Sequence, residues 1–73
     1  MSNFRERASR IGHDDLEALL DLAEAVRWDL DAVPNQIGAA DALKRSILTL
    51  NTNPSPMKLE VVRVRFAKLV MTL

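Results

Sequence analysis

The stretch PMKLEVVRVRFAKLVMTL, residues 56–73, decides the fold class through the spacing of its apolar side chains. Five of them recur at intervals of three and four residues, as on one face of a helix: Leu59, Val62, Phe66, Leu69 and Leu73. Residues 62–66 instead alternate apolar and charged side chains as a strand does, but Lys68 breaks that alternation. We therefore predict a helix over residues 56–72, with a strand within residues 59–66 as the alternative.

The same stretch carries a second row of apolar side chains, roughly opposite the first: Met57, Val61, Val64 and Met71. A helix that is apolar on two sides is usually buried on two sides. In a chain with only three short helices, the internal core can cover one of these rows. The second row therefore predicts packing against another protein chain, unless the helix lies centrally between the other two. Methionine is common at adaptable binding surfaces of this kind.

An amphipathic helix is predicted over residues 14–32, where Asp14 or Asp15 can act as the N-cap. Its apolar face follows from a turn of about 100° per residue. That face consists of Leu16, Leu19, Leu20, Ala23, Val26 and Leu30. Trp28 projects toward the polar side of the same helix. An indole on a polar face is a frequent interface anchor, although this ring could equally pack under the N-terminal residues or against the connection near Pro34.

A second helix is expected over residues 36–50, with Asn35 as its cap, because Pro34 interrupts the pattern of the preceding one. Its apolar face consists of Ala39, Ala40, Leu43, Ile47 and Leu50. Gly38, among alanines, would let this helix approach another backbone closely. Residues 51–56, NTNPSP, form the clearest loop and end on a serine–proline pair, which commonly starts a helix.

A chain of 73 residues has room for one domain, and its composition, 48% apolar with no cysteine, is globular without disulfides or thiolate zinc sites. We expect a single all-α domain over residues 1–73. It would combine an antiparallel helical hairpin with a C-terminal helix and form a homodimer through that helix. Residues 1–13, with three arginines against one glutamate, are expected to form a basic arm that is free to move.

The ten basic and ten acidic residues cancel in number but are segregated along the chain. Residues 14–34 hold seven carboxylates against one arginine, whereas residues 35–73 hold six cations against two carboxylates. The acidic segment could steer the protein toward a basic target surface or imitate nucleic acid electrostatically.

The sequence offers no residues at a catalytic or metal-binding spacing. His13 adjoins Asp14 and Asp15, but three adjacent residues cannot all converge on one ion. Asp29 and Asp31 begin like a calcium loop that then lacks its glycine and its final glutamate. No apolar run approaches the roughly 18–20 residues of a membrane span. We therefore expect a cytoplasmic protein that is not an enzyme and has no metal, cofactor or membrane partner.

The function that these observations favour is protein binding. We predict a small non-enzymatic regulator or adaptor that binds, and inhibits or modulates, a larger protein through an apolar helical surface rimmed by charge. The predicted contact residues are Trp28, Met57, Val61, Val64, Arg65, Lys68 and Met71. The alternative is a small dimeric DNA-binding protein whose arm and C-terminal helix contact phosphates. Those contacts would come from Arg5, Arg7, Arg10, Arg63, Arg65 and Lys68.

Overall fold

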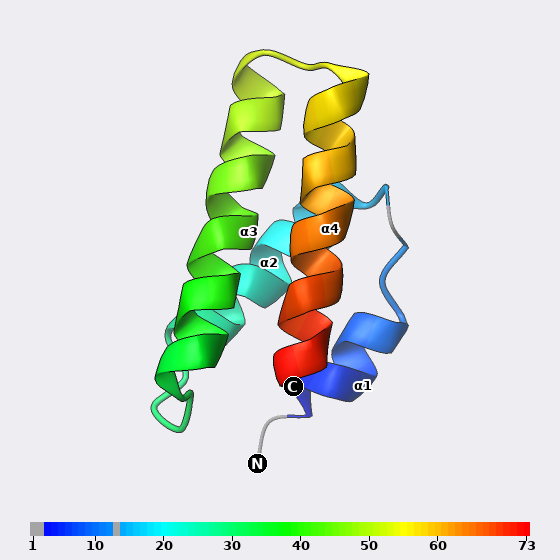
Figure 1. The fold of residues 1–73 in the computed structure, drawn as a ribbon. Coiled ribbons are helices and arrows are strands. Elements are labelled where there is room, and N and C mark those ends of the chain that lie inside the picture. Colours follow the sequence, from blue (N-terminus) through cyan, green and yellow to red (C-terminus); the bar gives the residue numbers. More distant parts are fainter. Residues whose placement is uncertain (1–2, 13) are drawn as a thin grey trace.

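A computed structural model describes residues 3–12 and 14–73 of the chain. Within these ranges the chain forms four helices and no strand: α1 (Phe4–Ser9), α2 (Leu16–Arg27), α3 (Pro34–Thr52) and α4 (Pro56–Thr72). The long helices α3 and α4 lie side by side and antiparallel, α2 lies behind them, and α1 sits near the C-terminal end of α4 (Figure 1). The all-helical prediction is confirmed, and the predicted helix over residues 56–72 has the bounds of α4.

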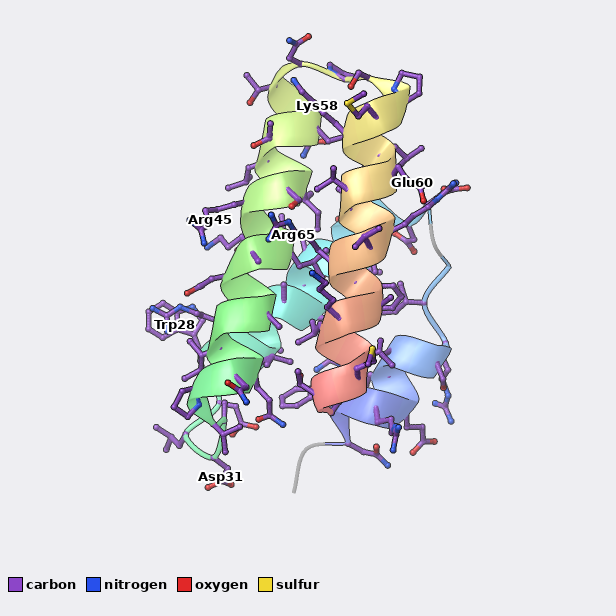
Figure 2. All side chains as sticks on the ribbon, in the orientation of Figure 1. Trp28, Asp31, Arg45, Lys58, Glu60 and Arg65 are labelled. Atoms are coloured by element: carbon purple, nitrogen blue, oxygen red, sulfur yellow. The ribbon has the colours of Figure 1, made fainter. Side chains whose placement is uncertain are left out.

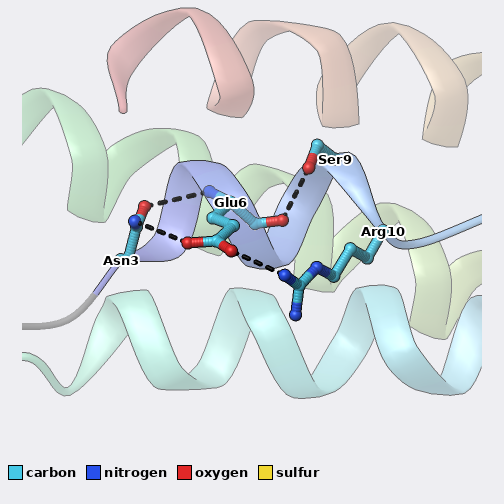
Figure 3. Close-up of polar contacts among 4 residues, drawn as sticks. All are labelled: Asn3, Glu6, Ser9 and Arg10. Atoms are coloured by element: carbon cyan, nitrogen blue, oxygen red, sulfur yellow. Dashed lines mark hydrogen bonds and ion pairs between the residues drawn. The ribbon is translucent and has the colours of Figure 1, made fainter.

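The prediction of three helices is wrong, because residues Phe4–Ser9 form an additional short helix, α1. Asn3 caps it, because its side-chain oxygen accepts a hydrogen bond of 3.0 Å from the Glu6 backbone N–H, and Arg10 pairs with the Glu6 carboxylate at 2.6 Å (Figure 3). Ala8 is buried, and Phe4 packs against the core. Six residues make a marginal helix in isolation, so tertiary packing and the cap stabilise it. The expected mobility of residues 1–13 stays a prediction, and His13 lies outside the described residues.

The predicted helix over residues 14–32 is too long at its C-terminal end. Asp15 caps α2 as expected, but the helix ends at Arg27, with Trp28 as its C-cap. The Asp29 carboxylate then accepts a hydrogen bond of 3.0 Å from the Asp31 backbone N–H, which favours a turn over another helical turn. Leu30, predicted to lie in the core, is consequently 100% exposed.

Helix α3 begins two residues earlier than predicted. Val33 is its N-cap and Pro34 its first residue, so the prediction of Asn35 as cap is wrong. Proline is well tolerated at this position because its missing N–H would have no partner within the helix. The Gln36 side chain accepts a hydrogen bond of 3.1 Å from the Val33 N–H and donates one of 3.0 Å to the Thr72 carbonyl. One amide side chain thereby links the start of α3 to the end of α4.

The hydrophobic core is built around α3, which packs against both α2 and α4. Each helix contributes apolar side chains at helical spacing to this core. The buried members are Ala8, Leu19, Leu22, Ala23, Val26, Ala40, Leu43, Ile47, Leu50, Val62, Phe66 and Leu69. The residues predicted for the apolar faces therefore do face the core or pack against its edge, with Leu30 as the exception, while Leu22 was not predicted.

Ion pairs across the helix boundaries accompany the core. Arg27 lies 2.8 Å from Asp41, and Lys44 lies 3.5 Å from Glu24, so two pairs join α2 to α3. Arg63 of α4 donates a hydrogen bond of 3.1 Å to Asp14, just before α2. This hydrogen bond, and then the charge of the same carboxylate, raise the pKa of Arg63 above its ordinary value. Such exposed pairs contribute little to stability, but they determine which charges remain free.

Replacement of Leu22 and of Leu30 by alanine should show where α2 ends. Leu22→Ala removes a fully buried side chain and should lower the free energy of unfolding by about 2–5 kcal/mol. Leu30→Ala, at a fully exposed position, should change it by less than about 0.5 kcal/mol. Urea unfolding followed by circular dichroism measures both values. A loss of more than about 1 kcal/mol in Leu30→Ala would show that α2 continues and buries this residue.

Gly38 offers a second stability test. A Cβ built on Gly38 meets no atom within 4 Å, so the predicted close approach to another backbone does not occur within the described chain. Alanine is the better helix former by roughly 0.5–1 kcal/mol. Gly38→Ala should therefore raise the unfolding free energy by about that amount in a urea titration. No gain would indicate that the glycine serves a contact outside this chain.

Candidate protein-binding surface

The outward side of α4 presents a row of apolar side chains, here called the apolar stripe: Met57, Val61, Val64 and Met71. Their exposed fractions are 79, 40, 47 and 83%, whereas Val62, Phe66 and Leu69 on the opposite side are buried. The stripe runs for about 21 Å at 1.5 Å per residue. Helix α4 is thus buried on one side only. The alternative that it lies centrally between the other two predicted helices is therefore wrong.

A shallow groove runs between α3 and α4 beside the stripe. From α3 it is lined by the small side chains of Ala42, Ser46 and Thr49. From α4 it is lined by Lys58, Val61 and Arg65. Arg45 of α3 completes the lining. Figure 2 shows the Arg65 side chain between the two helices.

A second hollow lies on the exposed side of α4 itself. It is lined by Met57, Glu60, Val61, Val64, Arg65 and Lys68. Val61 and Arg65 belong to both linings, so the groove and this hollow adjoin. Together with Met71, which lies farther along the stripe and lines neither of them, they are here called the α4 surface.

The charge of the α4 surface is predominantly positive. Within the described residues, no ion pair involves any of the four cations on this surface, which are Arg45, Lys58, Arg65 and Lys68. The Lys58 ammonium donates a hydrogen bond of 2.8 Å to the Asn53 carbonyl and so stays beside the groove. Among the described residues that line either hollow, Glu60 is the one carboxylate, and it lies 3.6 Å from Arg63. The positive charge of this surface is therefore not neutralised by ion pairs within the described residues.

The structure does not bring Trp28 together with the other predicted contact residues. Trp28 is 73% exposed and lies on the far side of α3 from α4 (Figure 2). The Arg27 guanidinium carbon lies 5.2 Å from the centroid of the indole, within the range of a cation–π contact. Leu30 and Val33, both exposed, follow Trp28 in the connection to α3. This second apolar group was not predicted, because it depends on where α2 ends.

A further hollow, mostly apolar, lies where the α3–α4 loop meets the start of α2. Its lining includes Leu16, Leu50 and Leu59, together with prolines of the loop. Two of its polar groups serve the fold: Asp14 pairs with Arg63, and the hydroxyl of Ser55 accepts a hydrogen bond from a backbone N–H of α4. Among the described residues, no three His, Cys, Asp or Glu side chains lie close enough together to hold a metal ion.

No helix in the described part of the chain is both long enough and apolar enough to cross a membrane. Comparison of the chain with protein-family models, with curated proteins and with solved structures gives no match. The α4 surface itself is therefore the basis of the function proposed below.

The exposure of Trp28 is open to a direct test. Because the ring is largely exposed, its emission should lie near that of an indole in water, and iodide should quench it almost as well in the folded as in the unfolded protein. Steady-state fluorescence with added iodide measures this, since Trp28 is the only tryptophan in the sequence. A blue-shifted and poorly quenched emission would instead place the ring inside a contact.

Proposed function

We propose that this protein is a small non-enzymatic regulator or adaptor that binds a larger protein through the α4 surface. The observation that carries the proposal is the exposed apolar stripe, four side chains along one side of a helix whose other side is already buried. Exposed apolar side chains gathered on one face are typical of an interaction site, whereas single exposed apolar residues are ordinary. Two methionines in the row suit a surface that adapts to its partner.

An interface of ordinary size would cover only a modest part of this chain. Transfer of a valine or methionine side chain from water into a contact stabilises an interface by roughly 1.5–3 kcal/mol at full burial. An interface of ordinary size takes about 800 Å² from each partner. That is about one sixth of the 4971 Å² of this chain. The apolar stripe would supply the centre of such an interface, and the groove with its cations would supply the rim.

A second copy of the chain is the other protein partner that the sequence predicts, and homodimer formation stays part of the proposal. The cytoplasmic location expected from the sequence also stays part of it. Exposed carboxylates of α2, among them Glu17 and Asp21, leave the idea of nucleic-acid imitation as a prediction.

DNA binding is the second candidate, because the cations of the α4 surface have no ion-pair partner in the described chain. Three of the six predicted phosphate contacts are nevertheless engaged elsewhere. Arg10 pairs with Glu6, Arg63 pairs with Asp14 and Glu60, and Arg7 lies 5.8 Å from the Phe4 ring. We therefore place DNA binding second.

Two substitutions in the apolar stripe test the proposed function. Val64→Asp together with Met71→Asp should leave the unfolding free energy within about 0.5 kcal/mol per site, because both side chains are exposed. The double variant should lose its partner in a nuclease-treated pull-down, and any dimer should dissociate in sedimentation. Leu48→Asp is the matched control, since Leu48 is a comparably exposed residue of α3 that lines neither hollow of the α4 surface.

Salt separates the two candidate functions. Contact with phosphates weakens by about 0.9 log units per log unit of salt for each phosphate neutralised. An apolar interface should hardly respond, so the wild-type chain should retain a protein at both low and high salt. Unchanged mass and unchanged partner recovery in the folded double variant would refute the proposal. Recovery that vanishes with nuclease, or that falls as steeply with salt as the neutralisation of several phosphates requires, would favour DNA binding.

A further inference from the structure

We propose that the α4 surface binds an acidic amphipathic helix of its partner, with carboxylates seven residues apart along one edge. This inference rests on the proposed function and specifies the chemistry of the partner. Its basis is the geometry of the cations beside the apolar stripe.

The shape of the surface fits a helix laid along α4. The apolar stripe is straight because its residues follow one side of a single helix, and it extends for about 21 Å. A partner helix of about 14 residues has the same length, and its apolar row can interdigitate with the stripe. On the α3 side, the small residues Ala42 and Ser46 leave room for the flank of that helix.

The cations give the partner helix its charge pattern. Lys58 and Arg65 are seven residues apart, and both line the groove between the apolar stripe and α3. Their separation along the axis of α4 is about 10.5 Å. A helix packed alongside at a shallow angle has the same repeat, so carboxylates at positions i and i+7 of its edge would meet both. Arg45 reaches the groove from α3 and adds a third positive charge to this edge.

Two other occupants fit the surface less well. If a second copy packs α4 against α4 in the antiparallel sense about a two-fold axis, equivalent edges meet, so Lys58 and Arg65 face the same cations of the other copy. A nucleic acid would satisfy these cations through its phosphates but would leave Val64 and Met71 in contact with water. An acidic helix is the occupant that covers the apolar and the charged parts together.

The experiment is a display selection on the full-length chain with a library of 16-residue helical peptides. Each peptide carries a fixed row of leucines at intervals of three and four residues, and the positions on both edges are random. We expect Asp and Glu to be enriched at two positions seven residues apart on one edge only. The best peptide should bind at least tenfold more tightly than its version with Gln at those two positions, measured by fluorescence anisotropy.

Charge reversal on the protein gives the matched test. Lys58→Glu with Arg65→Glu should weaken the acidic peptide at least tenfold and should favour the version with Lys at the two positions. Arg5→Glu is the control, because Arg5 is an exposed cation of α1 that lines neither hollow of the α4 surface, and it should have no effect. Circular dichroism establishes that each variant is folded.

The failures of the inference and of the proposed function are distinguishable. Peptides with neutral or basic edges that still need Val64 would overturn the acidic helix but retain protein binding by the apolar stripe. Failure to select any peptide, with a dimer whose mass falls on Val64→Asp, would assign the surface to a second copy. Binding of a DNA duplex that depends on Arg65 but not on Val64 would overturn both.

Discussion

The fixed orientation of α4 about its own axis decides which of its side chains face outward, and the α4 surface depends on it. Val62, Phe66 and Leu69 must face α3 and the core, since no other position of the helix buries all three. Successive residues turn by about 100°, so this requirement also determines which side chains face outward. The apolar stripe and the cations beside it are therefore as strictly placed as the core, even though they contact little within the chain.

A small chain cannot cover every apolar side that its helices carry. The molecule measures 36 × 22 × 17 Å, and its surface of 4971 Å² exceeds the roughly 4,500 Å² expected for a compact monomer of 8.2 kDa. Helix α3 has neighbours on two sides because α2 and α4 both pack on it. Among the described residues, no helix packs on the outward side of α4, so the second apolar row is exposed. A partner on this side would add a layer against that row.

The sequence predicts long-range periodicity better than local hydrogen bonding. Residues 56–72 and the core faces follow from spacing, because burial of a whole row outweighs the strand-like alternation over residues 62–66. The C-terminal end of α2 depends instead on one group, the Asp29 carboxylate, and the start of α3 depends on the ring of Pro34. Helices that end or begin a residue or two away differ little from these in free energy. The apolar stripe could be predicted for the same reason as the core. The α3 wall of the groove could not, because Arg45 approaches α4 only through the packing of α3.

The ion pairs explain how a chain with zero net charge presents a positive surface. Asp41, Glu24 and Asp14 are paired with Arg27, Lys44 and Arg63 of neighbouring elements. Within the described residues, cations without an ion-pair partner then remain on the α4 surface, and carboxylates without one remain on α2. This separation would orient a charged partner before contact, because the field of the whole molecule acts over distances longer than apolar contact does. The apolar stripe would then determine how tightly the partner is held. The charges would determine which partner binds and in which direction it lies along α4.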